Sequence, residues 1–123
     1  MSLYDITQLS LEGAIRGSAM RQTTLAANVA NANTPGYVRQ DVDFHGVLSA
    51  AMQSGDTPAT ERAVENASFS AGADASAPMQ ADGNSVDIDV ENASLAKNGL
   101  EYQALVSVAS ARLAILKSAM GVQ

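Results

Sequence analysis

The chain has 123 residues, no cysteine and a formal net charge of −6, and 46% of its residues are apolar but only 4% aromatic. A chain of this length forms one domain at most, and the lack of cysteine excludes disulfides, thiolate metal sites and cysteine nucleophiles. Residues 41–91 carry ten acids and one arginine, whereas both ends are mildly basic. This distribution disfavours general nucleic-acid binding, which needs a basic surface.

No run of about eighteen apolar residues is present, so we expect no membrane-spanning helix. The first residues also lack the basic region and long apolar stretch of a cleavable secretory signal. If the protein leaves the cytoplasm, we therefore expect it to use another export route.

The first part of the chain predicts a long helix that begins at about Tyr4 or Asp5 and ends at about Asn31. Apolar and small residues recur there at alternating spacings of four and three, which is typical of a helix packed on another helix. Gly13 and Gly17 weaken this helix but allow another backbone to approach closely. The principal row consists of Leu11, Ile15, Ser18, Gln22, Leu25 and Val29.

This helix is followed by an explicit stop. Pro35 disfavours a helical conformation for Thr34, and Gly36 then allows a sharp change of direction. Asparagine is uncommon inside helices because its amide competes for backbone hydrogen bonds, but asparagines buried between helices can fix their register. An ordinary helix end is the simpler alternative. The turn residues are Asn28, Asn31, Asn33, Pro35, Gly36 and Tyr37.

The middle of the chain predicts little regular structure. Apolar and acidic residues alternate over 41–44 and 86–91, which indicates two short extended pieces, and whether they pair stays open. Between them, 54–81 is rich in alanine and serine with few large apolar residues, so we expect it to be flexible. The expected segments are 1–36 (helix and turn), 37–52 (connector), 53–81 (flexible), 82–90 (turn and short strand) and 91–123 (C-terminal helix).

A second long helix is expected from about Glu91 to Ala119. Acidic residues near its start and Lys117 in its last turn complement the helix dipole, and Gly121 ends it. The fold class is therefore mainly α, with two long antiparallel helices forming a coiled-coil-like hairpin. The apolar row of this helix consists of Leu95, Asn98, Tyr102, Leu105, Ala109, Leu113, Leu116 and Met120.

Catalytic chemistry finds little support in this sequence. His45 is the only histidine, and no glycine-rich phosphate loop accompanies it. The acids of 82–91 do not fit a helix-flanked calcium loop, because the glycine is misplaced and no glutamate falls at the twelfth position. We therefore expect no catalytic residue, metal, cofactor, small-molecule substrate or nucleic-acid partner.

Two blocks of the sequence resemble known proteins. Leu25–Tyr37 resembles a signature of the flagellar rod, hook and hook-associated proteins. Asp82–Asp89 together with Asn98–Gln103 is most similar to the proximal members of the flagellar basal-body rod protein family. The resemblance implies a structural subunit that polymerises through its terminal helices in the periplasmic rod and transmits torque. The implied partners are other copies, other rod proteins, the base ring, the ring–rod adaptor and the flagellar type III export apparatus.

The resemblance also assigns roles to particular residues. Phe44 and Leu48 match a Phe-x-x-x-aliphatic element that docks early flagellar subunits on the export gate, although a small core anchor is an equal alternative. A non-polymerising helical-hairpin adaptor or chaperone is the alternative function, since helix periodicity does not identify a partner. The expected subunit-packing residues are Leu11, Ile15, Leu25, Val29, Leu95, Tyr102, Leu105, Leu113 and Leu116.

Overall fold

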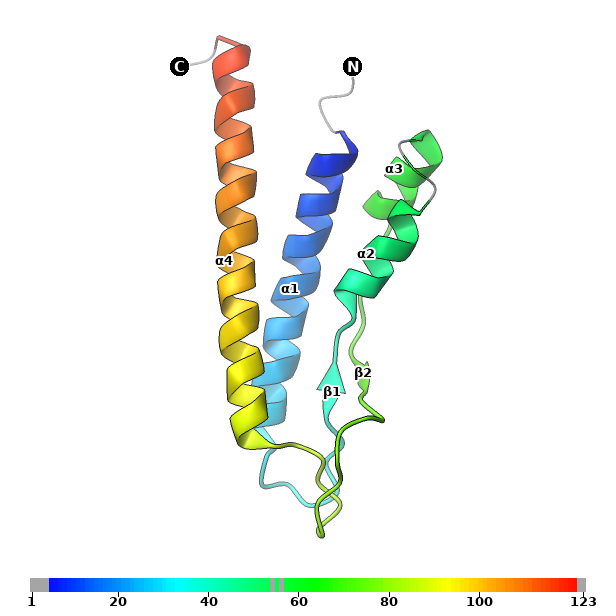
Figure 1. Ribbon diagram of the computed structural model, residues 1–123, viewed down its shortest axis with the longest axis vertical. Helices are drawn as coiled ribbons and strands as arrows, with labels where there is room; N and C mark the ends of the chain where they lie inside the picture. The colour runs from blue at the N-terminus through cyan, green and yellow to red at the C-terminus, as the bar shows by residue number, and fades with distance from the viewer. Residues whose placement is uncertain (1–4, 54, 56, 122–123) are drawn as a thin grey trace.

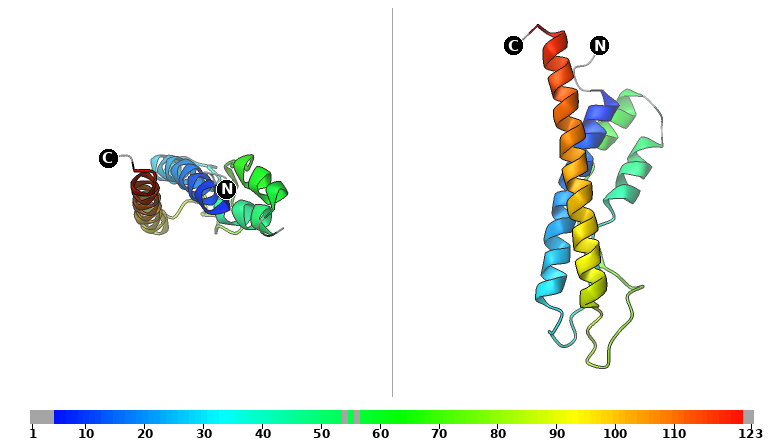
Figure 2. Two further views of the ribbon diagram at one scale, coloured as in Figure 1. Left: turned by 90° about the horizontal axis from the view of Figure 1, so that it is seen from above. Right: turned by 60° about the vertical axis from the view of Figure 1, so that its left-hand side comes forward.

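A computed structural model describes residues 5–53, 55 and 57–121. Its helices form three layers, with α1 between α4 on one side and the α2–α3 pair on the other (Figures 1 and 2). Below α2 and α3, two very short strands run side by side toward the loops at the lower end. The elements in chain order are α1 (Ile6–Ala30), β1 (Gln40–Asp41), α2 (Phe44–Met52), α3 (Pro58–Glu65), β2 (Gly72–Ala73) and α4 (Ile88–Ala119).

The two long helices run antiparallel, so α1 begins and α4 ends at the same end of the molecule (Figure 1). The Asp5 carboxylate caps α1 by accepting a hydrogen bond from the Gln8 amide, and α1 ends at Asn31. Tyr4, the earlier of the two expected starts, lies outside the described residues. Gly121 follows α4 with a φ of 69°, a left-handed conformation that ends the helix. The prediction of a mainly α fold with two long antiparallel helices is confirmed.

The predicted strand at 86–90 is wrong. Residues 88–90 form the first turn of α4, because the Asp87 carboxylate accepts hydrogen bonds from the amides of Asp89 and Val90. This cap satisfies amides that have no partner within the helix. Val86 is buried before the helix begins, whereas Ile88 and Val90 are exposed on it. The alternation of apolar and acidic residues therefore does not mark one buried face of a strand.

The other predicted extended piece, 41–44, is largely wrong: only Asp41 lies in a strand, β1, and Phe44 already begins α2. β1 lies antiparallel to β2, with Gln40 opposite Ala73 and Asp41 opposite Gly72. Beyond this pair, the amide of Asp74 donates to the carbonyl of Arg39. The alanine-rich middle of the chain therefore forms a short strand that pairs with the connector after α1.

The middle segment also contains α3, where the sequence predicts flexible chain. Thr57 caps this helix through its hydroxyl, and Pro58 occupies the first turn, where a missing amide hydrogen costs nothing. Thr60 and Val64 are fully buried. A few residues at helical spacing thus attach a polar segment to the rest of the fold.

The apolar core is small and lies between α1 and the α2–α3 pair. It consists of Val42, Phe44, Leu48 and Val64. Two glycines of α1 make room for it: a Cβ at Gly17 would lie 2.4 Å from Phe44 Cβ, and one at Gly13 would lie 2.9 Å from Leu48 Cδ2. In the described part of the chain, no helix is long and apolar enough to cross a bilayer.

Candidate assembly interface and polar junction

The contact between α1 and α4 contains a polar layer at its centre. The Asn98 side-chain amide of α4 donates to the Ser18 carbonyl at 2.9 Å and to Gln22 Oε1 at 2.7 Å. Asn98 and Ser18 are completely buried. All three residues belong to the rows predicted from helix periodicity, and the structure brings them together. A polar layer of this kind fixes the register of two helices.

The expected packing residues differ in how far a single chain buries them. Leu25 is fully buried, whereas Tyr102 is 38% exposed and Leu113 50% exposed. The remaining six are half-buried: Leu11, Ile15, Val29, Leu95, Leu105 and Leu116. Their role in subunit packing stays a prediction, but a single chain does not complete the seam.

Most of the apolar surface of α4 is exposed. Of its 32 residues, only Glu91, Asn98 and Ala109 are buried. Leu100 and Ile115 each retain 69% of their surface. A helix that is apolar on several faces is normally buried by neighbours on all of them. The long helix pair is therefore suited to an assembly in which other helices cover it.

At the lower end of the molecule, Asn28 is the centre of a buried polar cluster. Its side-chain nitrogen donates to the Gln40 carbonyl and to Glu91 Oε1, both at 2.7 Å. Its side-chain oxygen accepts from the Tyr37 hydroxyl and the Gln40 amide, both at 3.1 Å. These four bonds join α1, the connector and α4. We call Asn28, Arg39, Asp41, Asp74, Asn84 and Glu91 the polar junction.

Arg39 forms ion pairs with the acidic side chains of the polar junction. Its Nε donates to Glu91 Oε2 at 2.7 Å, and its Nη1 donates to Asp74 Oδ2 at 2.8 Å. Arg39 is 8% exposed and Glu91 is not exposed at all. A buried carboxylate persists as a charge only where it is paired and hydrogen-bonded, and Arg39 with Asn28 supplies both.

Asn84 joins the two sequence blocks that carry the family resemblance. Its buried side-chain nitrogen contacts the carbonyls of Asn31, Ala32 and Thr34 at 2.8–3.1 Å. Close by, Gly36 and Gly83 both have positive φ, and a Cβ at Gly83 would lie 3.4 Å from Gly36 Cα. The Asp82–Asp89 block is thus hydrogen-bonded, through Asn84, to the backbone of the turn that follows α1.

The predicted turn residues contribute unequally to this arrangement. Asn28 is buried, Tyr37 is half-buried, and Asn31 ends α1 while its side chain donates to the Ala27 carbonyl. Asn33 and Pro35 are exposed. Asn28 and Tyr37 therefore tie the turn to the polar junction, and the other residues shape the turn itself.

Sequence reasoning missed the central roles of Arg39 and Glu91. Glu91 was predicted only as an acid near a helix start, and Arg39 only as part of a mildly basic end. The available signal was the excess of acids over 41–91. Acidic side chains are almost never fully buried unless they are paired, so a buried acid in this segment would need a cation. Spacing alone does not reveal that these two residues meet, since they lie 52 positions apart.

Two aspartates of the polar junction have lowered pKa values. Partial burial alone would raise the pKa of Asp41, but hydrogen bonds from Arg21 and the Val42 amide, with the charges of Arg21 and Arg39, outweigh it and lower this pKa. Hydrogen bonds from the Ser76 hydroxyl and amide, and then from Arg39, lower the pKa of Asp74 in the same way. The ionised forms of both side chains are therefore favoured by folding.

Acid should weaken the fold through these aspartates. Because their folded pKa values lie below the unfolded ones, their contribution is present above about pH 4 and is lost as the pH falls through the folded values. We expect the urea concentration at the midpoint of unfolding to decrease as the pH is lowered from 5 to 3. In Asp41→Asn, the drop between these two pH values should be smaller. An equal drop in the variant and the wild type would contradict this assignment.

Phe44 and Leu48, the expected docking pair, lie side by side on the buried face of α2. Phe44 is 1% exposed and stacks on the exposed His45 ring, with ring centroids 4.0 Å apart. His45 Nε2 lies 2.6 Å from Glu101 Oε1 of α4. The core-anchor reading is therefore correct for the folded chain, and docking would require the unfolded chain.

No group of three or more histidine, aspartate or glutamate side chains within the described ranges could hold a metal ion. The polar junction lies beneath a long helix pair whose apolar surface is incompletely covered. The geometry can hold helices in register and present apolar faces to neighbours.

Comparison with known proteins agrees with this geometry. A family profile described as "Flagella basal body rod protein" matches residues 11–37. The "Flagellar basal body rod protein FlgB" of Escherichia coli (strain K12) is 37% identical over 108 residues, which cover 77% of this chain and 78% of that protein. The FlgB proteins of Bacillus subtilis (strain 168) and Cereibacter sphaeroides are 31% and 33% identical, over 98% and 81% of this chain and 97% and 82% of theirs.

A long helix pair with exposed apolar faces is typical of a structural subunit. The chain belongs to the FlgB family of flagellar basal body rod proteins. It is therefore a structural component of the flagellar basal body.

Proposed function

We propose that this chain polymerises through α1 and α4 in the periplasmic part of the flagellar rod and transmits torque. The observation that carries the proposal is the exposed apolar surface of α4, which neighbouring helices would cover. Many small contacts between interlocked helices resist shear, which is what a rotating rod requires. The proposed partners are other copies, other rod proteins, the base ring and the ring–rod adaptor.

The experiment that tests this proposal is mass spectrometry of purified hook–basal-body complexes from the source bacterium. We expect the chain at a few copies per complex, beside the other rod proteins. Its absence from intact complexes, together with abundance in the cytoplasm, would overturn the proposal and favour a non-polymerising adaptor or chaperone.

The polymerising role predicts a strong effect of Leu113→Asp. Leu113 is half exposed, so a charge there should leave the fold intact but prevent a neighbour from burying this part of α4. We expect loss of swimming, measured in soft agar, with a normal circular dichroism spectrum. Ala71→Ser, at an exposed loop position, is the control and should be nearly neutral. Wild-type motility of Leu113→Asp would contradict the packing role.

We also propose export through the flagellar type III apparatus without a cleavable signal, with Phe44 and Leu48 as the docking element. Both residues are buried in the folded chain, so they would be available only before folding. One pair of side chains can then serve export first and the core afterwards.

Replacing Phe44 and Leu48 by alanine should therefore reduce secretion more than a core substitution outside the docking element does. Val64→Ala is the matched control, because Val64 is fully buried in the same cluster but lies outside the docking element. We expect several-fold less secreted double variant than secreted Val64→Ala, measured by immunoblotting of culture supernatants. Equal secretion of the two would count against docking.

A further inference from the structure

A second row of residues runs along α4, and every member of it is exposed. Its spacings of four and three match a packing seam as closely as the row that faces α1 does. Leu100, Val108 and Ile115 of this row are 69%, 54% and 69% exposed. We call it the outer seam; all of its members are exposed, and they are Ala93, Lys97, Leu100, Ala104, Val108, Ala111 and Ile115.

The same chain carries an apolar groove that could receive such a seam. The groove has a volume of about 570 Å³ and lies between α2 and α4, with Ala14 of α1 among its lining residues. Apolar side chains dominate it, including Leu48, Met52 and Leu105. Glu101 stands at the end of the groove nearest the start of α2, where it contacts His45.

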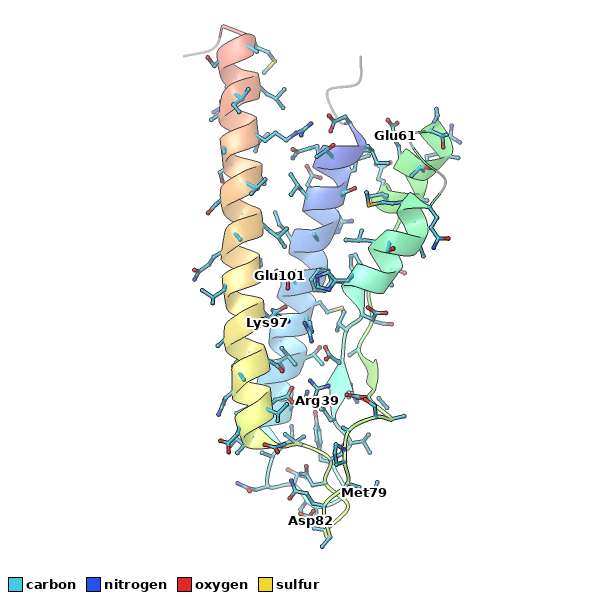
Figure 3. All side chains as sticks on the ribbon, viewed as in Figure 1. Arg39, Glu61, Met79, Asp82, Lys97 and Glu101 are labelled. Atoms are coloured by element: carbon cyan, nitrogen blue, oxygen red, sulfur yellow. The ribbon has the colours of Figure 1, made fainter. Side chains whose placement is uncertain are left out.

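The charges of the seam and the groove are complementary. Lys97 is the only charged residue of the outer seam and lies toward its lower end, and Glu101 marks the lower end of the groove (Figure 3). A seam that enters the groove of a copy pointing the same way brings Lys97 toward that Glu101. In contrast, two outer seams packed directly against each other in parallel would place Lys97 against Lys97.

We propose that the outer seam of one copy packs into the groove between α2 and α4 of a second copy, with Lys97 paired to Glu101. The inference rests on the proposed polymerising function, for which it names the partner and the two surfaces. Small alanines between the larger seam residues allow the two copies to approach closely. The contact covers both the most exposed face of α4 and the open side of α2.

The first test is self-association of the purified full-length chain, measured by sedimentation velocity. Val108→Lys should raise the dissociation constant about tenfold or more, because it places a charge inside an apolar contact. Met79→Lys is the control: Met79 is 70% exposed but lies in the lower loop, away from both surfaces (Figure 3). Its dissociation constant should match that of the wild type.

The second test uses the charge pair in trans. Lys97→Glu alone and Glu101→Lys alone should each weaken association, by roughly fivefold, because like charges then meet in every contact. An equimolar mixture of the two variants should restore it, since each seam then finds an opposite charge in the other variant's groove. A contact within one chain cannot produce this result. Thermal unfolding should show that both variants remain folded.

Three results would overturn the inference: wild-type association of Val108→Lys, a mixture no stronger than its separate variants, or a wild-type chain that stays monomeric at every concentration. None of these decides the proposed function. If the chain is present in purified basal bodies, the rod role stands and its neighbours contact it elsewhere.

Discussion

Arg39→Met should produce one of the largest losses of stability that a single substitution can cause in this chain. Among the described residues, it removes the one cation that pairs with the completely buried Glu91 and leaves that carboxylate with the Asn28 side-chain amide. Removing one partner of a buried ion pair typically costs about 3–5 kcal/mol, because the other charge stays in a poorly solvated site. We expect a corresponding fall in the free energy of unfolding, measured by urea denaturation.

Two further variants separate the ion pair from a general effect of losing a cation. Arg16→Met removes an exposed cation and should change stability by no more than about 0.5 kcal/mol. Glu91→Gln added to Arg39→Met should recover part of the loss, because glutamine still accepts from Asn28 but carries no charge. If the double variant is no more stable than Arg39→Met, the cost is one of packing rather than of an unpaired charge.

Gly17→Ala should also destabilise the fold, although alanine is the better helix former. The added methyl group would lie 2.4 Å from Phe44 Cβ and 2.7 Å from its Cγ, so α2 must move away from α1. Overpacking of this kind costs about 1–3 kcal/mol, and a contact this short belongs at the upper end. The gain in helix propensity is only about 1 kcal/mol. We expect a lower thermal midpoint and greater exposure of the core, detected by dye binding.

Gly99→Ala is the matched control for this prediction. Gly99 also lies within a long helix, but a Cβ there would meet only the side-chain nitrogen of Gln22 at 3.9 Å, an ordinary van der Waals distance. The same substitution should therefore raise stability by up to about 1 kcal/mol. A stabilising effect at both glycines would show that α2 does not pack closely on α1.

Several features of the fold were predictable because they depend on local chemistry and helix periodicity. The three-four spacing of apolar residues predicted α1 and α4, and Gly121 correctly marked the end of α4. The asparagine-rich turn after α1 was also correctly located. Gly13 and Gly17 predicted the close approach of another backbone, but the neighbours are the side chains of Leu48 and Phe44.

Other features depend on contacts between residues far apart in the chain, and local pattern misjudged them. At 86–90, one side-chain cap at Asp87 was enough to convert an alternating pattern into a helix start. In the middle segment, Val64 is buried only because Phe44 and Leu48 form a site for it. A segment with few apolar residues is predicted to be disordered when it is considered alone. It can still be ordered when those few residues complete a core formed by other segments.

The sequence by itself determined the helix pair, the turn and the family. Helix periodicity and turn chemistry depend on residues that are close together in the chain, and the family depends on the order of its motifs. Only the tertiary structure decided that Arg39, Asn28 and Glu91 form one buried junction, and which faces of α4 remain uncovered. The physical reason is that pairing of buried charges and coverage of apolar surface depend on which distant segments meet. Helix periodicity predicts an apolar face but not the neighbour that covers it.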